Sequence, residues 1–311
     1  MLSFVMKDIN GCEILFPPAL SVEINMDEDV PADSLLAVFP LLSTEELQEI
    51  AVLDDGETVF VGILDELERV ITASGVFLRV SARSLAAYLL DNEAMPQSYD
   101  HPSAQLIFDR HARSYGLRRG EADDAAYFGE LSVTKGSSQW SVIENFCNAC
   151  YSTKPRVSAD GALYMKGREV NGEVLFSEAD EGVRCTAVTE RIKRCAEISR
   201  VNIKLNSADG YSYPMLNADA ARRGIRRERY LNAMFAATPM TCADAMIARG
   251  REAGYCLSLE CPSRLLRVIG CSAALHSHTI DAPDGLYISA IRYRMTAQGE
   301  STRVELKRRN A

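Results

Sequence analysis

The sequence lacks any apolar run long enough to cross a lipid bilayer. Its first residues, MLSFVMKDIN, also lack the basic region followed by an apolar core that marks an export signal. We therefore expect a soluble protein that is made in the cytoplasm. At 311 residues, of which 47% are hydrophobic and 25% charged, the chain has the composition of a globular protein with two or three domains.

The cysteines lack a pairing pattern. Nine is an odd number, their spacing is irregular, and no export signal accompanies them. Such cysteines are expected to be reduced thiols that serve as small apolar side chains.

The chain lacks an excess of basic residues with which to bind nucleic acid. Its formal charge is −9 and its pI is near 5.1, whereas the neutralisation of phosphates requires a basic footprint. One basic cluster stands out, and it consists of Arg222, Arg223, Arg226, Arg227 and Arg229. We interpret it as a solvated, salt-bridged surface or, alternatively, as a contact with an acidic protein surface in an assembly.

Known catalytic sequence motifs are absent as well. The sequence contains no G-x-S-x-G, no H-E-x-x-H and no P-loop. Asp54-Asp55 and Asp123-Asp124 lie in expected loops beside small residues, where carboxylates are usually solvated. Of the histidines, His101 is expected at a helix start and His111 on a helix surface. The sequence therefore predicts no catalytic residue and no cofactor-binding residue.

One set of residues could suggest a metal site. Cys147-Asn-Ala-Cys150 matches C-x-x-C, and His276-Ser-His278 would place two imidazoles on one face of a strand. However, both cysteines share an apolar helical stripe with Trp140 and Ile143, which is typical of a buried helix face. A redox C-x-x-C would also be expected at the start of a helix. We predict no metal site.

Two stretches that lie 224 residues apart are alike, TASGVFLRVSAR at 72–83 and TAQGESTRVELK at 296–307. Each begins with Thr-Ala-x-Gly, which predicts a tight turn whose glycine has positive φ. Each continues as a strand of alternating polarity with its apolar residues facing inward.

The expected inward residues are Val76, Leu78, Val80 and Ala82 in the first copy and Val304 and Leu306 in the second. Apolar strands at 59–71 and 286–295 precede the two turns, so two hairpins are predicted. Any two hairpins can look alike, so duplication and coincidence both explain the likeness at this point.

The chain between the two hairpins has an ordered layout. Further strands are expected at 21–25, 35–39, 49–53, 127–133 and 200–206, and at 256–260, 265–270 and 278–281. Helices are expected at 84–94, 102–116, 137–151 and after Pro239, with Ser84 and Ser138 as N-caps. Asp160-Gly161 predicts a short hairpin. The layout is β, then α+β, then β with an inserted helix, which favours a duplicated β domain.

Three segments together resemble the baseplate hub proteins of phage tails and phage-tail-like bacteriocins. VFVGILDELERVITASGVFLRVSARSLAAYLLDNEAMPQSY is similar to the first β domain of that family, which has an F-x-G strand, a turn, a strand that ends near Arg-Ser and a helix. SVTKGSSQWSVIENFCNACYSTKPRVSADGALYMKG resembles the family's middle module, and DGLYISAIRYRMTAQGESTRVELKRR resembles its closing hairpin. The resemblance runs in order along nearly the whole chain.

The resemblance implies an α+β, mainly β fold, in which two tail-tube-like antiparallel β-barrel domains flank a small α+β module. The expected domains are 1–95, 96–184 and 185–311, the last with an inserted helix. Three copies would form a ring of six similar barrels that connects the sixfold tail tube to the trimeric spike. The partners would be the tube, the spike and other baseplate proteins, with DNA only as passing cargo.

Two other functions remain open from the sequence. One is an envelope-degrading hydrolytic tail component, which would need a general acid and a general base held together in one site. The other is a cytoplasmic Cys/His metal-binding protein. The resemblance favours a non-enzymatic structural protein in a virion or tail-like particle.

Overall fold

The structure is a computed structural model that describes residues 1–42, 46–73, 75–121, 124–167, 172–179, 181–233 and 238–308. It is mainly β with few helices, as expected from the sequence. The chain divides into two compact units. The first comprises Met1–Val170, Cys261–Gly270 and Ser289–Val304, and the second comprises Asn171–Glu260, Cys271–Ile288 and Glu305–Ala311. No helix in the described ranges is long and apolar enough to span a membrane.

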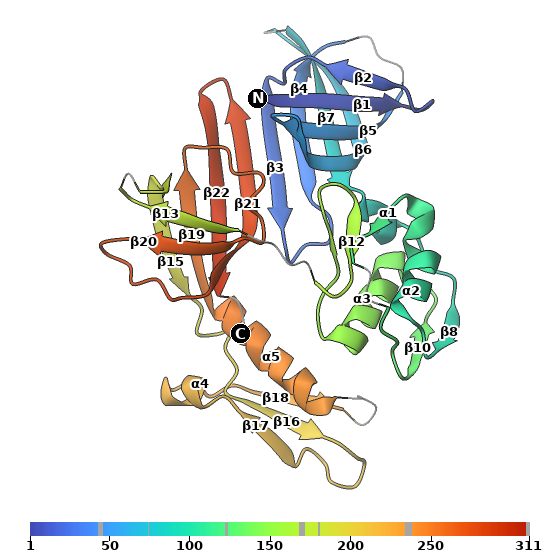
Figure 1. The fold of residues 1–311 in the computed structure, drawn as a ribbon, viewed down its shortest axis with the longest axis vertical. Helices are drawn as coiled ribbons and strands as arrows, with labels where there is room; N and C mark the ends of the chain where they lie inside the picture. Colours follow the sequence, from blue (N-terminus) through green and yellow to red (C-terminus); the bar gives the residue numbers. More distant parts are fainter. Residues whose placement is uncertain are drawn as a thin grey trace. The chain divides into compact units, whose positions relative to one another are not determined.

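An antiparallel sheet forms most of the first unit (Figure 1). Its strands are β1 (Leu2–Asp8), β2 (Glu13–Phe16), β3 (Ser21–Asp27), β4 (Ser34–Pro40), β5 (Leu47–Asp54), β6 (Glu57–Thr72), β7 (Gly75–Ser84) and β21 (Leu286–Thr296). The strands lie in the order β21-β3-β4-β7-β6-β5-β1-β2. Alternate residues of β1, β3 and β4 are buried, as the period-two pattern of their apolar residues requires.

A small α+β module follows in the same unit. Its elements are α1 (Ala86–Asp91), β8 (Gln97–Asp100), α2 (Ala104–His111), η1 (Arg113–Tyr115), β9 (Arg118–Arg119), β10 (Glu130–Val133), α3 (Gln139–Tyr151), β11 (Arg156–Val157) and β12 (Ala162–Tyr164). Ser138 caps α3 as predicted, because its hydroxyl accepts from the Ser141 amide at 3.1 Å. Ser84 is not a cap. It ends β7, and its hydroxyl accepts from the Asp33 amide at 3.1 Å.

The second unit contains the remaining strands of the sheet to which β1–β7 and β21 belong. They are β13 (Glu173–Ser177), β14 (Val183–Arg184), β15 (Ala187–Ile192), β19 (Tyr255–Cys261), β20 (Ser272–His276) and β22 (Gly299–Arg308), of which β19 and β22 are shared in part with the first unit. The predicted strands at 265–270 and 278–281 were wrong. The first segment is a loop. A hydrogen bond from the Thr302 hydroxyl to the Ser263 carbonyl, at 2.6 Å, ties the start of this loop to β22. The actual strand is β20, which ends at His276.

An inserted module lies between β15 and β19. It consists of β16 (Arg200–Lys204), β17 (Tyr213–Leu216), α4 (Ala218–Arg222), β18 (Glu228–Asn232) and α5 (Pro239–Gly254). The strands form a separate sheet in the order β17-β16-β18. Val201 and Ile203 of the central strand pack with Ala243 and Ile247 of α5 in one core, so α5 covers one face of this sheet (Figure 1).

The two predicted hairpins exist, as β6–β7 and β21–β22. Gly75 has φ 142° and Gly299 has φ 128°, values that favour glycine, whereas Ser74 of the first turn lies outside the described residues. The buried residues match at the same offset and are Leu78, Val80 and Ala82 in β7 and Thr302, Val304 and Leu306 in β22. Val76 was expected to face inward but is 40% exposed.

The likeness extends beyond the hairpins to the order of five strands. In the first half of the chain the order is β3-β4-β7-β6-β5, and in the last part it is β15-β19-β22-β21-β20. Numbered along the chain within each set, both orders are 1-2-5-4-3. Among the described strands the pairings branch at β21, which pairs with β20, β22 and β3, and no closed barrel is found, so the expectation of two barrels is not confirmed.

Candidate interaction surfaces

The residues considered for a metal site belong to different units, Cys147 and Cys150 to the first and His276 and His278 to the second. Cys147 is fully buried on α3, and burial raises the pKa of its thiol far above the ordinary value, so the thiol stays protonated. His276 is exposed, with its Nδ1 3.6 Å from a carboxylate oxygen of Glu181, and His278 follows the end of β20. Over the part of the chain that the structure describes, no group of three or more His, Cys, Asp or Glu side chains could hold a metal ion.

The loop carboxylates have structural roles. Asp54 was expected to be solvated but is buried, because the loop after β19 brings Arg264 within 2.8 Å and Arg267 within 3.5 Å of its oxygens. Asp124 accepts a hydrogen bond from the Gln105 amide at the start of α2, at 2.8 Å. Asp123 lies outside the described residues.

A buried tyrosine extends the network around Asp54. The hydroxyl of Tyr293 donates to Glu300 at 2.7 Å, and Arg264 contacts the same carboxylate oxygen at 2.8 Å. Burial and the hydrogen bond to Glu300 raise the pKa of Tyr293 to about 12. Each polar group in this network has a partner within the protein, which indicates a structural role and not a reactive site.

The expectation for His111 was wrong. It does not lie on a helix surface but is 2% exposed in the core of the α+β module, whereas His101 is exposed. Its Nε2 lies 3.0 Å from the Tyr99 hydroxyl and its Nδ1 lies 2.6 Å from Oε1 of Gln139. Burial lowers the pKa of His111, and the nearby Arg110 charge acts in the same direction.

We expect acid to destabilise the chain through His111. Because its folded pKa lies below the unfolded value of about 6.5, the unfolded state binds more protons, and stability falls as the pH drops below about 6.5. The loss is at most about 1.4 kcal/mol per pH unit. Urea unfolding at pH 7.5 and at pH 5.5 should show a smaller pH effect in His111→Gln than in the wild type, whereas His101→Gln should keep the full effect. Equal effects in both variants would contradict this assignment.

The first unit exposes an apolar surface at the end of the β6–β7 hairpin. We call it the hairpin-end patch, and it consists of Leu41, Leu42, Ile71 and Val76, which are 41%, 36%, 80% and 40% exposed. Ile71 and Val76 are paired in register, and the Leu41 amide donates to the Val76 carbonyl at 3.3 Å. Exposed apolar clusters of this kind mark protein contacts.

Sequence reasoning missed the hairpin-end patch, although a signal was present. The runs LAVFPLLST at 36–44 and VITASGVFL at 70–78 contain no charged residue. The corresponding end of the β21–β22 hairpin is polar, since Thr296, Gln298 and Ser301 are exposed there. The two hairpins therefore share a backbone but present different chemistry at their ends.

A second exposed surface is the face of the β17-β16-β18 sheet that α5 does not cover. Leu216 and Tyr230 are 67% and 64% exposed, and Tyr230 makes an edge-to-face contact with Tyr211 at a centroid distance of 5.2 Å. Asn202 of β16 is buried, and its side chain accepts from Arg200 at 2.6 Å and donates to Glu228 at 2.9 Å.

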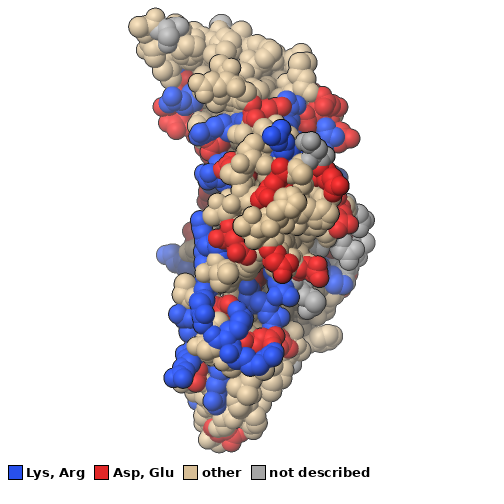
Figure 2. Space-filling model, turned by 90° about the vertical axis from the view of Figure 1, so that its left-hand side faces the viewer, with Lys and Arg blue, Asp and Glu red and all other residues tan. Residues whose placement is uncertain are grey.

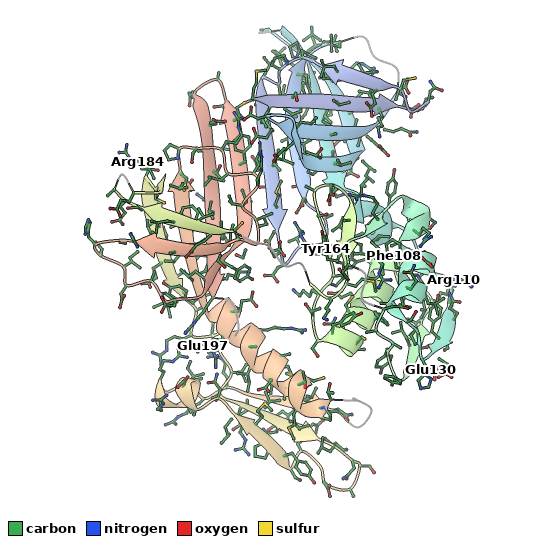
Figure 3. All side chains as sticks on the ribbon, in the orientation of Figure 1. Phe108, Arg110, Glu130, Tyr164, Arg184 and Glu197 are labelled. Atoms are coloured by element: carbon green, nitrogen blue, oxygen red, sulfur yellow. The ribbon has the colours of Figure 1, made fainter. Side chains whose placement is uncertain are left out.

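The third surface is a groove of about 630 Å³ in the second unit, which we call the basic groove. Its charged lining residues are Arg222, Arg223, Arg251, Arg308, Glu197, Asp219 and Asp281. Glu197 is buried beside α4 and the end of α5 (Figure 3), where Arg223 holds its carboxylate through two hydrogen bonds. Figure 2 shows Lys and Arg gathered on the surface around α4.

The arginine cluster fits both interpretations in part. Arg222 and Arg223 are ion-paired, with Asp219 and Glu197 respectively. Arg227 and Arg229 donate instead to backbone carbonyls, at 2.7 and 3.0 Å, and the exposed Arg226 has no partner within the described ranges. Three of the five charges are therefore not neutralised by a carboxylate.

Comparison with known proteins gives matches by structure alone. No protein-family model matches the sequence, and a search of curated proteins gives no match. The chain is similar over 99% of its length to a tail protein from Neisseria meningitidis MC58, at a TM-score of 0.76 and 18% identity, and covers 96% of that chain. It is similar over 99% of its length to the 43 kDa tail protein of prophage MuSo2 from Shewanella oneidensis, at a TM-score of 0.79 and 12% identity, and covers 98% of that chain.

A third match comes from a secretion system. It is the E. coli c3393 protein, a type VI secretion component that is described as structurally similar to the T4 phage tail proteins gp27 and gp5. The TM-score is 0.59 at 9% identity, over 94% of this chain and 74% of that one. The resemblance seen in the sequence is thus confirmed at the level of the fold, and the chain has the fold of phage tail proteins.

Proposed function

We propose that the chain is a structural baseplate hub of a phage tail or a tail-like particle. Three copies form a ring in which each copy contributes two tube-like domains, and the ring connects the sixfold tail tube to the threefold spike. The particle is a virion or a related injection device. In a phage, DNA passes through the ring as cargo.

The repeated strand order is the observation that carries this proposal. Two five-strand sets with the order 1-2-5-4-3 occur in one chain, and their hairpins share a turn motif and a pattern of buried residues. A chain with two similar domains can match a sixfold partner when three copies assemble, because three times two similar surfaces gives six. The fold likeness to tail proteins supports the same conclusion.

No specific observation favours either alternative function. A hydrolase would need a carboxylate or histidine with a perturbed pKa in a cleft, whereas His111 and Asp54 are buried among structural partners. A metal-binding protein would need ligands brought together, and Cys147 is instead packed in an apolar core. We therefore propose a non-enzymatic function.

The hairpin-end patch provides the test of a tail function. We expect Ile71→Asp with Val76→Asp to reduce the yield of complete tails at least about tenfold in the element that encodes the protein, because a charge in an apolar contact loses its hydration. Electron microscopy of particles made after deletion of the gene and complementation with each variant measures this yield.

The polar twin hairpin provides the control. Gln298→Asp changes the end of the β21–β22 hairpin by one charge and should leave the tail yield unchanged. The hub proposal is wrong if deletion of the gene leaves complete tails. It is also wrong if images of the particle show no threefold ring of this protein with six similar densities.

A further inference from the structure

Basic charge is concentrated in one segment of an otherwise acidic chain. Residues 191–229 contain ten Lys and Arg against four Asp and Glu, whereas the rest of the chain contains 24 against 39. The segment therefore carries a net +6 and the rest a net −15. The first unit alone contains 18 Lys and Arg against 28 Asp and Glu. A second copy of the chain would thus present a largely acidic surface to this segment.

The basic groove has a formal net charge of +1, because four arginines line it against the carboxylates of Glu197, Asp219 and Asp281. The side chains of Arg251 and Arg308 line it and have neither an ion pair nor a hydrogen bond within the described ranges. Arg226, which follows Arg223 by three residues, is exposed and has no side-chain partner among the described residues either. By contrast, Arg222 and Arg223 pair with Asp219 and Glu197 and hold the wall of the groove in place.

The groove also offers an apolar contact. Ile192 is 61% exposed and lines the groove between the exposed cationic residues Arg191 and Lys193 in the sequence. An exposed apolar residue bordered by exposed cations suits an acidic protein surface better than a phosphate polymer, because interface cores combine apolar anchors with a charged rim.

We infer that the basic groove docks the acidic first unit of a neighbouring copy of this chain. The inference rests on the proposed hub function, because a threefold ring requires that each interface join two different surfaces of the chain. An acidic unit and a basic groove on one polypeptide provide such a pair. The same charges would oppose a contact between like surfaces, in which groove would face groove.

Sedimentation equilibrium of the full chain tests this inference. We expect wild-type self-association to weaken as NaCl rises from about 50 to 300 mM, because salt screens the charge attraction. We expect the double variant Arg251→Glu/Arg308→Glu to associate at least about tenfold more weakly than the wild type at the lower salt. Neither arginine has a side-chain partner in the part of the chain that the structure describes, so circular dichroism and thermal unfolding should show an intact fold.

A matched variant controls for net charge. Arg69→Glu/Lys135→Glu changes the formal charge by the same amount at two exposed residues of the first unit whose side chains have no ion pair or hydrogen bond in the described ranges, and it should associate at least as strongly as the wild type. Equal weakening in the two variants, or a chain that stays monomeric at low salt, overturns the inference. If a trimer forms that neither salt nor Arg251→Glu/Arg308→Glu affects, the docking inference is wrong while the hub proposal stands. If no ring is found in particles, the hub proposal fails.

Discussion

Replacing Arg156 by alanine is expected to lower the free energy of unfolding by about 3–5 kcal/mol. The Arg156 side chain is 6% exposed and forms a bidentate pair with Asp33, at 2.7 and 2.9 Å, whose side chain is 4% exposed. Its other terminal nitrogen donates to the carbonyls of Asp27 and Val30, at 2.9 and 3.1 Å. Alanine would leave a buried carboxylate without its charged partner and the Val30 carbonyl without this donor, while the Asp27 carbonyl would keep the Val30 amide at 3.1 Å. The loss therefore exceeds that of an exposed ion pair.

Two variants separate the ion pair from simple loss of packing. Lys154→Ala removes an exposed pair with Asp29 in the same loop and should change the free energy of unfolding by no more than about 1 kcal/mol. Arg156→Met combined with Asp33→Leu removes both charges and should cost less than Arg156→Ala alone. Urea unfolding of the full chain measures each value. If the double variant is less stable than Arg156→Ala, the pair is not the source of the effect.

Gly62→Ala should cost about 3 kcal/mol, for a different reason. A Cβ at Gly62 would lie 2.3 Å from the carbonyl oxygen of Arg83 and 2.8 Å from its carbon. Gly62 is paired with Ser84 between β6 and β7, so the clash is with the backbone of the neighbouring strand and cannot be relieved by a rotamer change.

A second glycine serves as the control. Gly56→Ala adds the same methyl group where no atom lies within 4 Å, and its φ of 86° costs about 1 kcal/mol. Thermal or urea unfolding should therefore place Gly62→Ala well below Gly56→Ala in stability. Comparable losses at the two glycines would mean that the approach of β7 to β6 is not what requires Gly62.

The hub proposal and the docking inference assign different tasks to the two units. The uncharged end of the β6–β7 hairpin is suited to an apolar protein contact, and the basic groove is suited to an acidic one. The twin β21–β22 hairpin ends in polar residues, so the two copies of the repeat are chemically distinct. In a ring of three chains with six similar domains, the apolar hairpin end would therefore occur three times and not six. Such a ring could bind a threefold partner through this surface.

Local features of the fold were predictable from the residues. Both hairpins, the Ser138 cap and the helix after Pro239 follow from interactions between residues close in the chain, such as glycine turns and side-chain caps. The apolar stripe on α3 was also recognised, because burial on a helix repeats every three to four residues. The predicted strand at 265–270 failed because short apolar runs occur in packed loops as well as in strands.

The sequence by itself determined where the two hairpins turn, most of the inward-facing residues of their second strands and which segment is basic, since these depend on neighbouring residues and on composition. Only the tertiary structure decided that His111 and Asp54 are buried, that Arg156 meets Asp33 and that the two five-strand sets share one order. Each of these depends on partners far away along the chain. The physical reason is that burial and ion pairing are properties of the packed neighbourhood, and a local pattern does not specify which distant residues form it.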